Sequence, residues 1–450
     1  MRMQGVLRPA QGGREKLAGT SCCRAAVSVA IAAFLAATAP PPGNTASTAD
    51  FTRLVVLGDG FAAGEADGTL FDGQSAPVPV PLGQRESFAS HLGAAMDTAV
   101  VFPRIEYPGR FGRNQVILKP GHCEFEADAF TVGFGLGGRV DPFEVPNVVA
   151  VPEQRVRDAL DRRWDIDPQD LSTVDTVEDL ILGLPFAFLP APPASQVETA
   201  LAQVPTFAVV WLGNEDVLAA ARRGDAEGLT PSPEFREAIE EVLDALVASG
   251  AGAAVANIPD PTVLPLFMPE QELFDYLVEH RDPEDPVEPD VTHDGIRILL
   301  GVPRRGYMLR TFQAFASAEG IGDGLQPAPL PGNLFLSARE VRRIRLAVRR
   351  YNAAIAAAAA ERGIVLVDVH GLFEGWRGEG VDAGGRHLAT GYLGGLFGLD
   401  GIHPTNSGHA LIAGAVLDAI NRACGTDLEG PDLDAVVAAD PLAICSGPAR

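Results

Sequence analysis

The sequence predicts an α/β fold: a three-layer α/β/α sandwich with a mainly parallel sheet and long insertions at the strand ends. Short apolar runs that stop at turn residues alternate along the chain with longer segments of helical periodicity, a pattern typical of parallel sheets covered on both faces. In addition, 46% of the 450 residues are hydrophobic, which is enough apolar material for a large core.

Four apolar runs are predicted to be buried strands, because each is short, contains β-branched residues and ends at turn-forming residues. They cover residues 53–57, 207–212, 253–258 and 364–368. Helices are expected at residues 233–249, 338–361 and 407–422, where apolar side chains recur on one face.

Two regions rich in Pro and Gly, residues 73–205 and 265–335, are interpreted as insertions. Ligands bind outside the carboxyl ends of the strands in open α/β sheets, so such insertions either shape a pocket or are surface elaboration. We therefore expect one main domain over residues 50–424, followed by a C-terminal tail over residues 425–450.

The first 49 residues have the layout of a secretory signal and a short linker. Basic residues precede the apolar run 25–37, which is too short to span a bilayer comfortably, and small residues follow it. An uncleaved membrane anchor is the alternative interpretation. We expect an exported protein, periplasmic or extracellular, with no stable membrane span after signal cleavage.

The formal net charge of −24 argues against nucleic acid as a partner, because an acidic chain repels phosphate backbones. The eight histidines are scattered, so neither a metal nor another cofactor is expected. Gly58, Gly60 and Gly64 also fit a loose dinucleotide-binding turn, but a Pro-rich stretch follows where that site needs a strand and an acidic residue.

Three cysteines remain after residue 49, namely Cys123, Cys424 and Cys445. An exported location allows one disulfide and leaves one thiol over. Cys424 with Cys445 is the expected pair, because it would tie the last predicted helix to the C-terminal tail.

Candidate chemistry is found at three places. Asp400 and His403 lie three residues apart before the last predicted helix, where the carboxylate can accept the imidazole Nδ1–H and leave Nε2 free as a general base. The same spacing also occurs in helix caps and surface pairs. Asn214 follows a buried strand and either donates to an oxyanion, worth roughly 3–4 kcal/mol, or caps a helix. Gly60 lies in a sharp turn after the first strand, where backbone N–H groups are exposed.

In this order, the three places resemble the SGNH (GDSL-type) hydrolases, which carry a Gly-Asp-Ser turn, an Asn-containing block and a late Asp-x-x-His-Pro. The resemblance extends over most of residues 51–423, is closest to a bacterial exported subgroup, and implies hydrolysis of a carboxylic ester, in a lipid or an acylated sugar. It implies that His403 is the general base and Asp400 its orienting partner. It also implies an oxyanion hole formed by Asn214 and the backbone N–H of Gly60, with Ala150 as a further candidate donor.

The serine of the family is replaced by Gly60, which cannot form an acyl-enzyme. Loss of a serine nucleophile costs on the order of 10⁶ in turnover. Three alternatives stay open: His403 activates water directly, another serine such as Ser75 or Ser87 takes the role, or the chain is an inactive lipid- or carbohydrate-binding protein that keeps the pocket. Ser87 is also expected to be a helix N-cap.

Overall fold

The computed structural model describes residues 49–72, 83–107, 109–112, 115–118, 129–132, 137–170, 172, 174, 176–189, 191–279, 301–310 and 331–449. The predicted signal segment up to residue 48, Ser75 and Cys123 lie outside the described residues. No helix of the described part is long and apolar enough to cross a membrane.

A five-stranded sheet forms the centre of the fold. Its order is β13 (Val365–Val367), β9 (Gly252–Ala256), β8 (Phe207–Trp211), β1 (Leu54–Gly58) and β7 (Val148–Ala150). All neighbouring strands are parallel, and Gly58 lies opposite both Ala150 and Trp211. The parallel sheet predicted from the four apolar runs is therefore confirmed. β7 lies within the region expected to be an insertion, and its three residues are too few for a strand pattern in the sequence.

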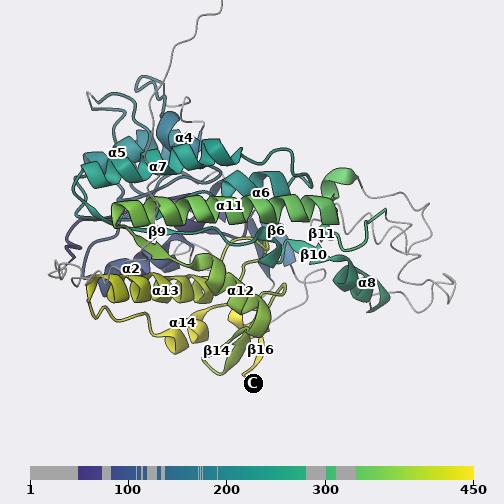
Figure 1. Ribbon diagram of the computed structural model, residues 1–450. Helices are drawn as coiled ribbons and strands as arrows, with labels where there is room; N and C mark the ends of the chain where they lie inside the picture. Colours follow the sequence, from purple (N-terminus) through teal and green to yellow (C-terminus); the bar gives the residue numbers. More distant parts are fainter. Residues whose placement is uncertain are drawn as a thin grey trace, which may run out of the picture. The chain divides into compact units, whose positions relative to one another are not determined.

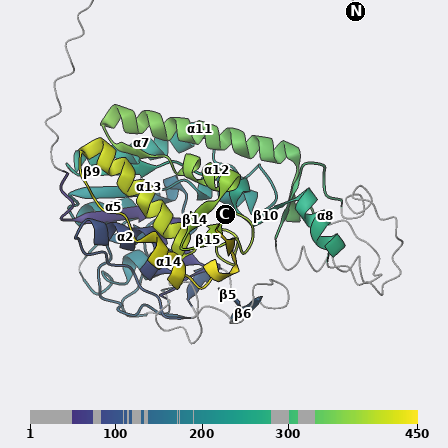
Figure 2. The same ribbon diagram turned by 90° about the horizontal axis from the view of Figure 1, so that it is seen from below.

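Helices cover both faces of the sheet (Figures 1 and 2). One layer contains α4 (Val156–Asp161), α5 (Gln196–Ala202), α6 (Glu215–Ala221), α7 (Ser232–Ala248) and α11 (Ala338–Arg362). The other contains α2 (Phe88–Ala95), α13 (Asn406–Cys424), α12 (Val369–Glu379), which packs on α13, and α14 (Leu433–Ala439). The predicted three-layer α/β/α sandwich is thus confirmed.

The longest helix, α11, shows how local sequence sets its ends. At its N-terminus Ser337 accepts the Glu340 N–H, while the Glu340 carboxylate accepts the Ser337 N–H. At its C-terminus Gly363 adopts φ 66°, a left-handed conformation that glycine reaches without strain. Tyr351 stacks on Phe235 of α7 with ring centroids 4.2 Å apart, which joins the two helices of this layer.

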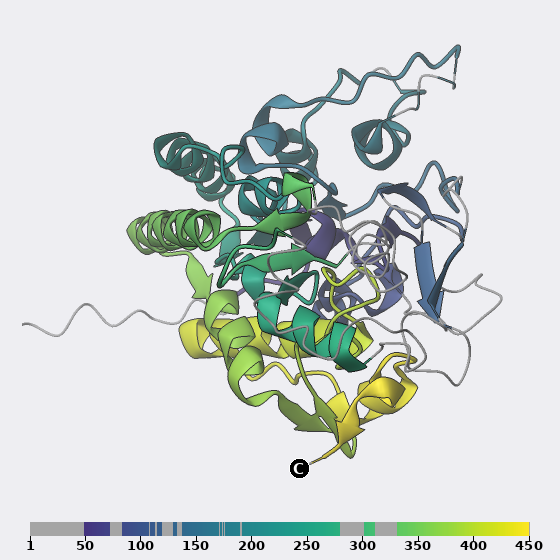
Figure 3. The same cartoon turned by 90° about the vertical axis from the view of Figure 1, so that its right-hand side faces the viewer.

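The shorter elements lie around the sheet. They are β2 (Glu65–Ala66), β3 (Thr69–Leu70), β4 (Arg110–Gly112), β5 (Gln115–Leu118), β6 (Ala129–Val132), β10 (Phe267–Pro269), α8 (Glu270–Glu279), β11 (Tyr307–Leu309), β12 (Phe335–Leu336), β14 (Val381–Ala383), β15 (Arg386–Leu388) and β16 (Gly447–Pro448). In Figure 3, α8 faces the viewer and the C-terminal strand β16 lies at the lower edge.

The predicted Cys424–Cys445 disulfide is wrong. Cys424 is a free thiol, whereas Cys445 forms a disulfide with another cysteine. The reason is the path of the C-terminal tail, which returns along α13 so that Asp440 accepts the Ser407 N–H and hydroxyl at 2.8 and 2.7 Å. Cys424 is at the opposite end of α13, roughly 25 Å from Ser407 at 1.5 Å per residue. Disulfides require Cα atoms within about 7 Å.

Candidate active site

The carboxyl end of β1 leads into the turn that holds Gly60. Asp59 caps the short helix α1 (Gly60–Ala63) by accepting the Phe61 N–H at 3.2 Å. A Cβ at Gly58 would lie 2.2 Å from the Ala62 Cβ, so only glycine allows the strand and this helix to approach so closely. The turn therefore places residue 60 at the edge of the sheet, as the sequence predicts.

Asp400 and His403 lie close together, as predicted. The His403 Nδ1 is 2.6 Å from Asp400 Oδ2, and Asp400 Oδ1 accepts the backbone N–H groups of Ile402 and His403. The Gly68 N–H also donates to Asp400, at 2.9 Å. Burial raises the pKa of Asp400, but His403 and the backbone N–H groups of Ile402 and His403 outweigh it and bring the pKa below its usual value. Asp400 is therefore a carboxylate that fixes the His403 ring.

Glu65, a residue that the sequence did not single out, occupies the other side of His403. Its Oε2 lies 3.3 Å from His403 Nε2. A Cβ on residue 60 would stand 2.8 Å from the same nitrogen and 2.3 Å from Glu65 Oε2. The Glu65 carboxylate therefore fills the space that a nucleophilic side chain at position 60 would need. The side chains of Glu65 and His403 are only 9% and 6% exposed, so this pair is nearly closed to solvent.

The two carboxylates change the protonation of His403. Burial lowers the pKa of the imidazole, but Glu65 and Asp400 outweigh burial and raise it to about 9. Both ring nitrogens then carry hydrogen at neutral pH. The free Nε2 expected from the sequence is thus not found, because Glu65 holds it in an ion pair.

Further carboxyl groups lie near Glu65, His403 and Asp400. Burial raises the pKa of Asp59 to about 8, with a smaller contribution from Glu215. Burial likewise raises the pKa of Glu65 and of Asp67. Arg222 partly compensates the negative charge, with its Nη2 2.7 Å from Glu215 Oε2. Asp59 is consequently a neutral carboxylic acid at pH 7.

Asn214 lies at the carboxyl end of β8, and its amide is hydrogen-bonded to Asp59. Its Nδ2 donates to the two carboxyl oxygens of Asp59 at 3.0 and 3.3 Å. Its Oδ1 is buried and has no hydrogen-bond partner in the described part of the chain. Asn214 occupies the N-cap position of α6 without a side-chain capping bond, so the helix-cap alternative does not explain this side chain.

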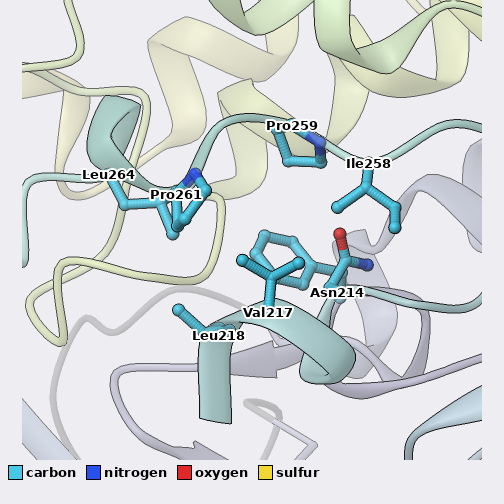
Figure 4. Close-up of a pocket in the computed structure, with 8 residues that line it drawn as sticks. Asn214, Val217, Leu218, Ile258, Pro259, Pro261 and Leu264 are labelled. Carbon is cyan, nitrogen blue, oxygen red and sulfur yellow. The ribbon is translucent and has the colours of Figure 1, made fainter. Parts of the chain in front are cut away.

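A small cavity lies beside Asn214 (Figure 4). Its volume is about 10 Å³, which is room for about one water molecule. Apart from the Asn214 amide the lining is apolar, and it consists of Phe61, Val217, Leu218, Ile258, Pro259, Pro261 and Leu264. The Phe61 ring also contacts His403, with centroids 5.2 Å apart, and so connects the cavity with the imidazole.

The other predicted residues are not joined to His403. Ala150 is buried at the end of β7 beside Gly58, and its role as an oxyanion donor stays a prediction. Ser87 takes the N-cap position of α2 without a side-chain capping bond, and its buried hydroxyl has no partner among the described residues. The described part also contains no group of three or more His, Cys, Asp or Glu that could hold a metal ion.

Fold and site together define a three-layer α/β/α protein with a buried Asp-His pair at the carboxyl edge of the sheet. The profile of the GDSL-like Lipase/Acylhydrolase family matches residues 149–416, more than half of the chain, and the chain belongs to this family. The match includes Asn214, Asp400 and His403. It begins after Gly60 and Glu65.

Comparison with solved structures finds matches of low identity and low TM-score. An acetylxylan esterase from Geobacillus stearothermophilus, Axe2, is 13% identical with a TM-score of 0.34, over 85% of this chain and 97% of that chain. The α/β hydrolase LAE5 from the Lake Arreo metagenome is 13% identical with a TM-score of 0.34, over 84% and 96%. A putative lipolytic protein of the G-D-S-L family from Desulfitobacterium hafniense is 11% identical with a TM-score of 0.33, over 82% and 99%. No match was found among curated proteins.

Proposed function

We propose that this protein acts on small carboxylic esters at the Asp400–His403 pair, by a route without a serine. The observation that carries the proposal is the row of Glu65, His403 and Asp400. Glu65 Oε2 lies 3.3 Å from His403 Nε2, and Asp400 Oδ2 lies 2.6 Å from His403 Nδ1. A histidine between two carboxylates can transfer protons to and from a bound ester. No serine hydroxyl of the described residues is hydrogen-bonded to His403 Nε2, so the proposed route uses no serine.

Asn214 supplies the oxyanion donor after a rotation of its amide. Because Asp59 is neutral at pH 7, its O–H can donate to Asn214 Oδ1 once the amide turns by 180°. That rotation gives the orphaned Oδ1 a partner and frees Nδ2 to donate to a ligand in the cavity. A donor of this kind contributes roughly 3–4 kcal/mol to transition-state stabilisation.

The size of the cavity favours a short acyl group. A space of about 10 Å³ accepts about a water-sized or methyl-sized group, and its apolar lining suits a methyl. Acetyl esters therefore fit better than long-chain lipids.

The disulfide of Cys445 supports an exported location, which we also propose. Structural disulfides persist in oxidising compartments and are rare in the cytosol of most organisms.

The test is hydrolysis of p-nitrophenyl acetate and octanoate by the protein and by its His403→Ala variant. We expect acetate to be preferred, and His403→Ala to lower kcat at least about 100-fold, since a positioned acid-base group contributes 10²–10⁴. His387→Ala is the matched control, because His387 Nδ1 also contacts a carboxylate, Asp382, at 2.8 Å but outside the site. Equal losses in the two variants would contradict the proposal.

The second candidate function is ligand binding without hydrolysis. It is favoured by Glu65, whose carboxylate oxygen lies 2.3 Å from the position of a Cβ on residue 60 and would have to shift for a nucleophilic side chain there. A protein that binds acylated sugars or lipids, yet hydrolyses no ester under conditions where its folding is intact, would support this alternative.

A further inference from the structure

We propose that Glu65 is the nucleophile of this site and that His403 serves first as its acid and then as its base. The inference rests on the proposed ester chemistry and assigns the reacting atom within it. Two things differ from the serine route. A glutamate rather than a serine forms the covalent intermediate, and the proton transfers occur in another order.

The position of Glu65 carries the assignment. Its Oε2 lies where a side chain on residue 60 would have to stand, 2.3 Å from the built Cβ position. The same oxygen is 3.3 Å from His403 Nε2, within reach of the proton that the ring carries. The carboxylate thus faces His403 from the place that the family reserves for its nucleophile.

The chain path explains how a residue five positions after Gly60 comes back to the same point. The short helix α1 ends at Gly64, which adopts φ 75° and reverses the chain. Glu65 then begins β2, which pairs with β3 through Glu65 and Leu70. A Cβ at Gly64 would lie 2.8 Å from the Gln84 Cα, so a side chain at this reversal would collide with backbone.

The resting protonation state suits a carboxylate nucleophile. A serine must lose its proton to a neutral histidine before it attacks, whereas a carboxylate attacks as it is. The His403 imidazolium, with a pKa of about 9, is therefore the form needed to protonate a leaving alkoxide. A protonated His403 cannot activate a serine, but it is the form that a carboxylate nucleophile needs.

The first step forms a mixed anhydride. Glu65 Oε2 attacks the carbonyl carbon of the ester, and the bond between that carbon and the alkoxide oxygen breaks. The proton on His403 Nε2 passes to the leaving oxygen, so that a neutral alcohol departs. Glu65 is then acylated and His403 is neutral.

The second step restores the site. Acylation removes the negative charge of Glu65, one of the two carboxylates that hold the proton on His403, so Nε2 now accepts a proton from water. The hydroxide attacks the acyl carbon and the anhydride bond breaks. The carboxylic acid leaves, Glu65 is a carboxylate again and His403 is an imidazolium.

Other charges near His403 do not alter this order. They belong to Asp59, Asp67, Glu215, Arg222 and His409. Among the first three, burial is the main influence and raises each pKa. Burial also lowers the pKa of His409 to about 3, which keeps it neutral. Glu65 and His403 are therefore the two groups whose charges change during the cycle.

The test uses p-nitrophenyl acetate with the full-length His403→Gln variant. The p-nitrophenolate leaving group needs no proton, so acylation of Glu65 proceeds in this variant. Hydrolysis of the anhydride, however, lacks its base. We expect a burst of about one equivalent of p-nitrophenolate and an acetylated protein in intact-mass spectra after acid quench. Glu65→Gln/His403→Gln is expected to give neither. A burst of the same size in the double variant, or an acetyl group mapped to another residue, would overturn the assignment.

Single substitutions separate this inference from the proposed function. Glu65→Gln is expected to lower kcat/KM at least about 100-fold, with Glu65→Asp as a second variant that keeps the charge and loses less. If His403→Ala abolishes hydrolysis while Glu65→Gln leaves it intact, the ester function stands and Glu65 is not the nucleophile. If the protein hydrolyses no ester and His403→Gln gives no burst, both proposals fail.

Discussion

Gly60→Ser combined with Glu65→Ala is expected to create a conventional serine esterase, whereas Gly60→Ser alone is not. In the single variant the new Cβ stands 2.3 Å from Glu65 Oε2 and 2.8 Å from His403 Nε2. Removing the Glu65 side chain vacates that space and removes one of the two charges that keep His403 protonated. The imidazole then has the lone pair that serine activation needs.

The expected gain for the double variant is roughly 100-fold in kcat/KM for p-nitrophenyl acetate over the parent, since serine nucleophiles are worth several orders of magnitude in established triads. Covalent labelling of the new serine by an organophosphonate provides an independent readout. Glu65→Ala by itself is the control, and it is expected to be inactive. Organophosphonate labelling of the serine in the Gly60→Ser single variant would show that Glu65 does not occupy the nucleophile position.

The protein is expected to lose stability above neutral pH, because His403 loses its proton there. The folded pKa of His403, about 9, lies above the unfolded value near 6.5. The contribution of protonated His403 to the unfolding free energy is therefore fully present below pH 6.5 and is lost as the pH rises through 9. A shift of this size corresponds to roughly 3 kcal/mol of unfolding free energy.

Asp59 also titrates in part of this range, because burial raises its pKa to about 8. Its stabilisation likewise declines as the pH rises from about 4 to 8, so the parent alone does not isolate His403. The measurement is urea unfolding of the parent and of His403→Gln at pH 6.5 and 9.5, with Asp59 present in both. We expect the difference in unfolding free energy between them to shrink at the higher pH. A constant difference would contradict the imidazolium.

The sequence predicts the sheet and the Asp400–His403 pair because both depend on local pattern. Buried parallel strands are continuous apolar runs, and an Asp three residues before a His meets it across one turn. β7 escapes prediction because three residues carry no periodicity. Glu65 escapes because its contact with His403 joins segments about 340 residues apart and depends on the reversal at Gly64.

The pairing of the cysteines could not be predicted from the sequence for a different reason. Their spacing suggested a link between Cys424 and the C-terminal tail, but pairing depends on where that tail runs. Buried contacts of Asp440 with Ser407 bring the tail to the far end of α13 instead. Such a path follows from tertiary hydrogen bonds, which no local pattern in the sequence contains.

The protonation of His403 is the point on which the account depends, and NMR measures it directly. Nitrogen-15 and proton shifts of the His403 ring, followed from pH 5 to pH 10, give its pKa in the parent and in Glu65→Gln. We expect titration near pH 9 in the parent and at a clearly lower pH in the variant, with both ring nitrogens protonated at pH 7. Titration at or below pH 6.5 in the parent, unchanged in Glu65→Gln, would contradict it.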